Sequence, residues 1–255
     1  MKWIVGIVLL LSVAVSDEAS AESYSITTID LAPKSEFYNT KETTIRYPIF
    51  HFADKKIEKK INKTIRVEFL EELAMADEAP SKYSDKGLLK LCIVSGLTSL
   101  SVDTVTYVSD NLISFQIGYE WVGAYPTSGK RYFTFDLTTG KQLTIDDLIK
   151  ADKRAVFRKL LRTLQHKVIE KFRAASLENA KTKQISQDDL DIIEDHIKSD
   201  CMQSFDSTRF SIYPYAMVVM IDCEFPHAIQ ALDDHDNVVV SKKVLLPFID
   251  DRFKY

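Results

Sequence analysis

The chain contains little glycine or proline, with seven of each in 255 residues. Extended linkers and low-complexity tails are rich in these residues, so their scarcity argues against such segments. The formal net charge is only −4, and this mildly acidic balance excludes nonspecific nucleic-acid binding. Hydrophobic residues make up 45% of the chain and aromatic residues 11%, which is enough for one large core or two small ones. The composition therefore predicts a compact globular protein.

Long apolar runs are also missing after the first 15 residues, and the run found there has the pattern of an export signal. Lys2 supplies a positive n-region, residues 3–15 are continuously apolar, and Ala19-Ser20-Ala21 matches a signal-peptidase site. The run is shorter than the roughly 20 residues that a spanning helix needs, so cleavage is favoured over an uncleaved anchor. We expect a mature chain that is periplasmic or secreted, with no membrane span after cleavage.

Cysteine is scarce, with only Cys92, Cys201 and Cys223 present. In an exported protein, three cysteines predict one disulfide and one remaining thiol. Cys201 and Cys223 flank a local segment, and closing such a loop stabilises by about 3 kcal/mol in the chain-entropy model. Cys92 lies in the apolar run Leu91–Val94 and is expected to be a buried small hydrophobe. A bridge from Cys223 to Cys201 is favoured, with Cys92 as the alternative partner.

Established catalytic motifs are absent from the sequence: there is no Gly-X-Ser-X-Gly elbow and no phosphate-binding glycine loop. The acidic run Asp233-Asp234-His235-Asp236 contains metal-ligand types. Consecutive loop residues seldom converge on one ion, so a solvated turn is the preferred interpretation and no metal or cofactor is expected. A small secreted hydrolase or deacetylase using His227, Asp234 or His235 stays as the alternative.

Residue periodicity predicts an α+β fold, in which an antiparallel β-meander sheet packs against two or three amphipathic helices. The apolar stripe Ile57, Ile61, Ile65, Phe69, Leu73, with Leu70 beside it, indicates a helix capped by Asp54. Longer helices are expected over residues 153–175 and over 187–198. The first is indicated by the stripe Val156, Leu160, Leu164, Val168 and Phe172, which Leu161 and Ile169 widen. Strands are expected over residues 24–31, 44–52, 90–109 as one or two strands, 112–121, 131–137, 209–213, 216–223 and 238–246.

The stretch from Asn111 to Lys150 organises this pattern. It contains two strands, a turn at Thr138-Thr139-Gly140-Lys141, and Thr144 before Asp146 and Asp147 at a helix start. Three segments follow from the whole pattern: a signal peptide over 1–21, an N-terminal α+β segment over 22–110 and a C-terminal α+β segment over 111–255. The last two are expected to pack as one globular unit.

The same stretch resembles a bacterial family, the domain of unknown function 3298. The resemblance lies in Tyr-Phe-Thr-Phe-Asp-Leu-Thr-Thr-Gly-Lys at 132–141, Leu-Thr-Ile-Asp-Asp-Leu at 143–148 and a Gly-Ala-X-Pro loop at 123–126. Tyr47-Pro48, Ile57, Ile61-Asn62 and Ile65 are similar to an associated upstream segment, the domain of unknown function 4163. Together the two resemblances cover roughly residues 45 to 248.

This resemblance implies an extracytoplasmic module. Relatives stand beside the catalytic domain of peptidoglycan deacetylases, or form the lysozyme-sensing outer part of a membrane-anchored anti-sigma factor. The implied function is therefore a noncatalytic cell-envelope binding module that recognises peptidoglycan or a muralytic enzyme such as lysozyme. The family loop usually reads Gly-Ala-His-Pro, whereas this chain has Tyr125 in place of the histidine, which removes any role a loop histidine would have.

The loop between the two predicted strands is the candidate binding site. It offers planar apolar faces beside charged residues, a composition able to stack on a sugar ring or to enter a protein pocket. An alternative is that Trp121 ends a buried strand and only Tyr125 is exposed. The candidate residues are Trp121, Gly123, Ala124, Tyr125 and Pro126.

Overall fold

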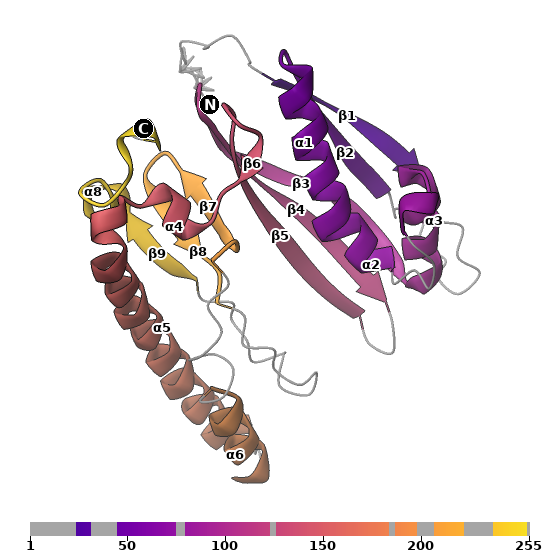
Figure 1. Ribbon diagram of the computed structural model, residues 1–255. Coiled ribbons are helices and arrows are strands. Elements are labelled where there is room, and N and C mark those ends of the chain that lie inside the picture. Colours follow the sequence, from indigo (N-terminus) through magenta and orange to yellow (C-terminus); the bar gives the residue numbers. More distant parts are fainter. Residues whose placement is uncertain are drawn as a thin grey trace, which may run out of the picture.

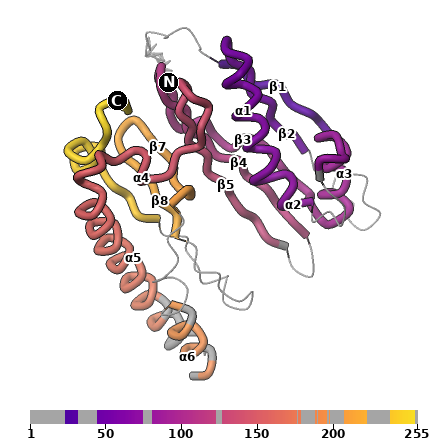
Figure 2. The backbone as a smooth tube through the Cα atoms, viewed as in Figure 1, coloured from indigo at the N-terminus to yellow at the C-terminus, as the bar shows by residue number. Residues whose placement is uncertain are grey.

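The computed structural model describes residues 24–31, 45–74, 80–122, 126–183, 187–197, 207–221 and 237–253. Within these ranges the chain forms a six-stranded sheet, a three-stranded sheet and several helices (Figure 1). One long helix extends away from the three-stranded sheet, while the shorter helices of the N-terminal half cover the larger sheet (Figure 2). The predicted α+β class is confirmed.

The six-stranded sheet has the order β1-β2-β3-β4-β5-β6 and is mostly antiparallel. Its one parallel pairing joins β2 to β3, through Ile45 and Leu100. The predicted first two strands and the three-stranded meander are all present. The strands are β1 (Tyr24–Leu31), β2 (Ile45–Phe52), β3 (Leu97–Val108), β4 (Leu112–Val122), β5 (Pro126–Asp136) and β6 (Lys141–Gln142).

Two turns fix the register of the meander. At the β3–β4 turn the Ser109 amide donates to the Leu112 carbonyl at 2.8 Å. After β5, Gly140 adopts a positive φ of 70° and its amide donates to the Asp136 carbonyl at 2.8 Å. The predicted tight turn is confirmed, because glycine takes this conformation without the steric cost of a Cβ. The expected boundary at residues 110 and 111 falls in the β3–β4 turn, so both α+β segments contribute to one sheet.

The first helical segment follows the predicted apolar stripe. It comprises α1 (Lys55–Ile65), the π-helical η1 (Arg66–Glu71) and α2 (Glu72–Ala74). Asp54 is the predicted cap, and its Oδ1 accepts from the Lys56 amide at 2.7 Å. The wider π-helical turn brings both Phe69 and Leu70 to 0% exposure. This face packs on Phe115, Phe133 and Phe135, all on one side of the central strands.

The prediction of strand structure from residue 90 was wrong in its first part. Residues Asp85–Ser95 form α3, capped by Ser84, whose Oγ accepts from the Gly87 amide at 3.2 Å. A short apolar run such as 91–94 does not distinguish a buried strand from a helix by periodicity. The helical assignment buries Cys92 completely and leaves Val94 85% exposed.

The C-terminal half forms a second core around the three-stranded sheet, whose order is β7-β8-β9. Its elements are α4 (Ile145–Leu148), η3 (Ala151–Lys153), α5 (Arg154–Lys183), α6 (Gln187–His196), β7 (Phe210–Tyr213), β8 (Ala216–Val219), β9 (Val238–Ser241), α8 (Lys242–Leu245) and η5 (Asp251–Phe253). A short 3-10 turn, η2 (Pro80–Lys82), belongs to the first half.

Two predictions for this half need correction. The buried face of α5 is centred on Phe157, Leu161 and Ile169, whereas Val156 at the start of the predicted stripe is 57% exposed. The rest of the predicted stripe is confirmed, because Leu160, Leu164 and Val168 pack against the second core and Phe172 packs against a smaller cluster around Ile169. The last strand ends at Ser241, because residues 242–245, expected to continue it, turn into α8.

The two sheets meet through a buried polar layer. Side chains alternate along β4 and β5, so the face opposite α1 carries Ser114, Gln116 and Thr134. Ser114 Oγ accepts from the Ile212 amide at 3.0 Å, and Gln116 Nε2 donates to Tyr213 Oη at 2.7 Å. The central strands are therefore covered on one face by helices and on the other by β7.

Candidate functional site

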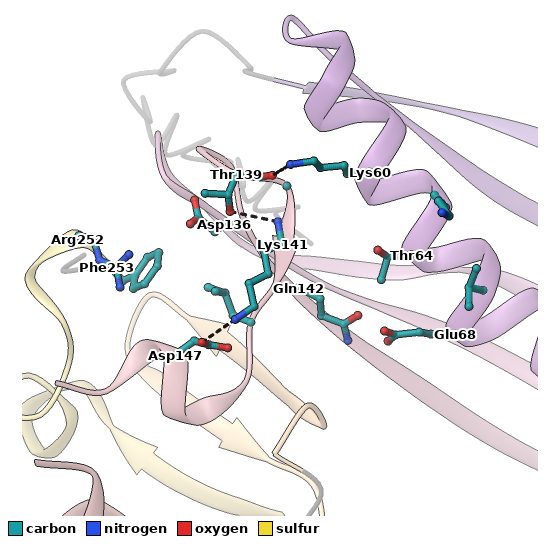
Figure 3. Close-up of a pocket in the computed structure, with 14 residues that line it drawn as sticks. Lys60, Thr64, Glu68, Asp136, Thr139, Lys141, Gln142, Asp147, Arg252 and Phe253 are labelled. Atoms are coloured by element: carbon teal, nitrogen blue, oxygen red, sulfur yellow. Dashed lines mark hydrogen bonds and ion pairs between the residues drawn. The ribbon is translucent and has the colours of Figure 1, made fainter. Parts of the chain in front are cut away.

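A pocket of about 710 Å³ lies where three separate segments of the chain approach one another (Figure 3). One wall comes from α1 and η1, a second from the β5–β6 turn with the start of α4, and a third from η5. The lining residues are Lys60, Lys63, Thr64, Val67, Glu68, Asp136, Thr139, Gly140, Lys141, Gln142, Leu143, Asp147, Arg252 and Phe253.

The turn after β5 is held close to α1. A Cβ at Gly140 would lie 3.1 Å from the Cβ and Cδ of Lys60, so the missing side chain permits this approach. Lys60 Nζ donates across the gap to the Thr139 carbonyl at 2.7 Å. The turn and the helix thus form a fixed pair of walls.

Local hydrogen bonds and ion pairs at the starts of α4 and η5 hold the side chains of the other two walls. Thr144 and Asp147 form a capping box at the start of α4, and Lys141 Nζ lies 2.8 Å from Asp147 Oδ1. In η5, Asp250 Oδ1 accepts from both the amide and Nε of Arg252, each at 3.0 Å. These contacts orient Lys141 and Arg252 at the pocket wall.

The charges of these caps are fixed at neutral pH. Partial burial by itself raises the pKa of Asp147, but hydrogen bonds from Lys141 and Thr144 outweigh it and hold the pKa below its usual value. The hydrogen bond that Arg252 donates to the Asp250 carboxylate raises the pKa of Arg252 above its already high value. Asp147 and Arg252 therefore stay ionised, with their polar atoms engaged by neighbours.

The helical wall changes polarity along its length. Lys60, Thr64 and Glu68 are spaced four residues apart, and all three line the pocket. Glu68 points from the helix toward the carboxamide of Gln142 (Figure 3). Gln142 Oε1 is buried and has no hydrogen-bond partner among the described residues. Ammonium groups thus lie toward one end of this wall, and hydrogen-bond acceptors at the other.

The ammonium end has positive charge available for a ligand. Lys63 is exposed, and within the described ranges it forms no ion pair. Lys60 is hydrogen-bonded to a neutral carbonyl and not to a carboxylate. A carboxylate of a ligand could therefore bind here, while an ammonium or amide N–H could donate to the acceptors at the other end.

The predicted binding loop is described only at its two ends. Trp121 and Pro126 belong to β4 and β5, while Gly123, Ala124 and Tyr125 lie outside the described residues. Trp121 is partly buried against the first core, and its Nε1 lies 3.0 Å from where a Cβ of Gly96 would stand. Pro126 begins β5 and Asp136 ends it at the pocket, so these two residues are about 33 Å apart at 3.3 Å per residue.

Several other predicted residues also fall outside the described ranges. These are Cys201, Cys223, His227 and the run 233–236, so the expected disulfide and the alternative enzymatic site stay predictions. Cys92 is a buried free thiol in this structure, and burial raises its pKa to about 12. At neutral pH this thiol is therefore protonated and poorly nucleophilic.

His51 and His166 have structural partners, and no metal-binding group of three is formed by the described side chains. His51 Nε2 lies 2.7 Å from Thr27 Oγ1, which joins β1 to β2. His166 Nδ1 lies 3.9 Å from Glu170 Oε1 on the same face of α5. Among all the residues that the structure describes, no helix is long and apolar enough to cross a membrane.

The pocket was not predicted from the sequence. Lys60 and Lys63 lie on the polar face of an amphipathic helix, which indicates solvent exposure and not a shared site. In the sequence, the position of Asp147 at a helix start accounts for that residue without a binding role. No motif or spacing in the sequence points to Arg252. The two available clues were Gly140, which permits close approach, and a helical line running from lysine through threonine to glutamate.

These features define an α+β module with two facing sheets and an open polar pocket at one end of the larger sheet. No protein-family model and no curated protein matches the sequence. A DUF3298 family protein from Pseudomonas aeruginosa has a similar structure, with a TM-score of 0.53 and 15% identity over 90% of this chain and 94% of that one. A member of the same family from Bacteroides fragilis has a TM-score of 0.49 and 12% identity, and the match again covers 90% of this chain and 94% of that one.

The Pseudomonas aeruginosa structure shows that this chain has the fold of a DUF3298 family protein, as the resemblance of the central motif implied. The similarity of the upstream region to the domain of unknown function 4163 stays a prediction.

Proposed function

We propose that this protein is an exported, noncatalytic cell-envelope module that binds peptidoglycan or a muralytic enzyme such as lysozyme. The observation that carries the proposal is the open pocket of mixed charge between α1, the β5–β6 turn and η5. Peptidoglycan presents sugar rings together with peptide carboxylates and amines, and the pocket offers partners for each of these charged groups. The signal pattern at residues 1–21 supports an extracytoplasmic location.

The loop around Tyr125 is proposed as a second contact with the same polymer. A tyrosine ring can stack on a sugar face and add affinity without new charge. Pro126, which follows Tyr125 in the sequence, and the pocket lie at opposite ends of β5, a separation that suits an extended polymer better than a small free molecule.

Co-sedimentation of residues 22–255 with purified sacculi tests this function, with and without added lysozyme. Pelleting with bare sacculi supports wall binding, and Tyr125→Ala should weaken it while leaving the melting temperature almost unchanged. Pelleting only in the presence of lysozyme identifies the enzyme as the ligand. If the protein stays in the supernatant under both conditions, the proposal is wrong, and a metal analysis with a hydrolase substrate screen follows.

A further inference from the structure

We infer that the pocket between α1 and the β5–β6 turn is a site for a short zwitterionic peptide, with its carboxylate at Lys60 and Lys63 and its ammonium at Glu68 and Gln142. This assigns a ligand class to the pocket and a direction to the ligand within it. The inference deepens the proposed function and rests on it for the source of such peptides in the cell envelope.

The carboxylate end follows from the charges on α1. Lys60 and Lys63 are three residues apart, so their side chains leave the helix on neighbouring faces and can meet one carboxylate. Lys63 forms no ion pair with any described residue, and Lys60 is bound only to a carbonyl. By contrast, Lys141 is already paired with Asp147, and Arg252 with Asp250. The two helix lysines are the cations available to a ligand.

The ammonium end follows from the acceptors. Gln142 Oε1 is a buried acceptor with no described partner, and a buried polar atom left in this state is costly. The carboxylate of Glu68 points toward the same carboxamide, and Thr64 lies between it and Lys60 along the helix (Figure 3). A ligand ammonium placed here would donate to Gln142 Oε1 and interact with the charge of Glu68.

The spacing sets the size of the ligand. Lys60 and Glu68 are eight positions apart on a helical segment, about 12 Å at 1.5 Å per residue. Both side chains are long enough to shorten this gap. An extended peptide spans about 3.3–3.6 Å per residue, so two or three residues would join the two ends. The pocket volume of about 710 Å³ is sufficient for a ligand of this size.

Calorimetric titration with trialanine as the probe tests the site, alongside N-acetyl-trialanine and trialanine amide. The tripeptide with both ends free should bind to residues 22–255, and each capped form should bind about tenfold more weakly, since each loses one charge-assisted contact. In Lys63→Gln the preference for the free carboxylate over the amide should disappear. In Glu68→Gln the preference for the free amine over the acetylated form should disappear.

Lys59→Gln is the matched control, because Lys59 is an exposed lysine of the same helix that does not line the pocket. It should bind all three peptides as the unmodified protein does. Equal binding of free and capped peptides, no binding of trialanine, or equal losses in Lys59→Gln and Lys63→Gln would each overturn the inference.

The outcome is separable from the proposed function. If the protein pellets with sacculi but does not bind trialanine, the proposal of wall binding stands and the assignment of the pocket to a zwitterionic peptide is wrong. The protein could instead bind trialanine, with selective loss in the two pocket variants, and yet not pellet with sacculi. That result would support the peptide site and show that the cell wall is not the source of its ligand.

Discussion

Gly96 shows how one residue can position a candidate binding element. It ends α3 with a φ of 125°, and its carbonyl accepts from the Val122 amide at 2.8 Å. A Cβ there would lie 2.4 Å from the Val122 carbonyl oxygen and 3.0 Å from Trp121 Nε1. The end of β4, where the predicted binding loop begins, is thus packed directly on glycine backbone.

Gly96→Ala should therefore lower the free energy of unfolding by about 2 kcal/mol, from left-handed backbone strain and the displaced strand end. Urea unfolding would measure this change. Trp121 is the only tryptophan after residue 21, so its fluorescence should also report the displacement in the folded state. Gly87→Ala is the control, because its nearest Cβ contact would be an ordinary 3.4 Å. A stable Gly96→Ala variant with unchanged fluorescence would contradict this account.

At the scale of elements, α4 depends on its capping box. Asp147 Oδ2 accepts from the amide and the hydroxyl of Thr144 at 2.9 and 2.8 Å, and Lys141 binds its other oxygen. The folded pKa of Asp147 lies below its usual value of 3.8. A lowered folded pKa adds stability above the unfolded pKa, and that stability is lost as the pH falls through the folded pKa.

Asp147→Asn should therefore destabilise the protein by about 1 kcal/mol at pH 7. The difference from the unmodified protein should shrink as the pH falls below 3.8, through the lowered folded pKa of Asp147. Denaturant unfolding at several pH values measures both effects. Asp152→Asn, at an exposed acid in η3, should show little change at any pH. A constant difference between Asp147→Asn and the unmodified protein across this range would contradict the proposed linkage.

Elements with a strong local signal were predictable from the sequence, and those fixed by tertiary packing were not. The stripe from Ile57 to Phe69 and the turn at Gly140 were correctly predicted, because helical periodicity and a positive φ are local properties. The helix around Cys92 was missed, since an apolar run of four residues suits a strand equally well. The pocket was missed for a different reason: Lys60, Gln142 and Arg252 become neighbours only through the fold.

At the scale of the whole molecule, the two cores are joined by hydrogen bonds between side chains and backbone as well as by apolar contact. Ser114 Oγ contacts both the Ile212 amide and Thr134 Oγ1 at 3.0 Å, and all three residues are fully buried. This arrangement ties β7 to the centre of the larger sheet. Removing the hydroxyl would leave the Ile212 amide buried without its acceptor.

Ser114→Ala should lower the free energy of unfolding by about 1–3 kcal/mol, the cost of an unpaired buried donor. Hydrogen exchange should accelerate most in β7 and β8, because the lost contact lies between the sheets and not within the first core. Ser128→Ala on the exposed part of β5 should change stability by less than about 0.5 kcal/mol. Uniform acceleration over both sheets would indicate that they unfold as a single unit.

The position of Arg252 and Phe253 at the pocket wall has a practical consequence for experiments. Any chain that continues beyond these residues must leave from beside the pocket. An affinity handle or fluorescent fusion attached after Tyr255 would begin two residues from the wall, where it could block a ligand or imitate one.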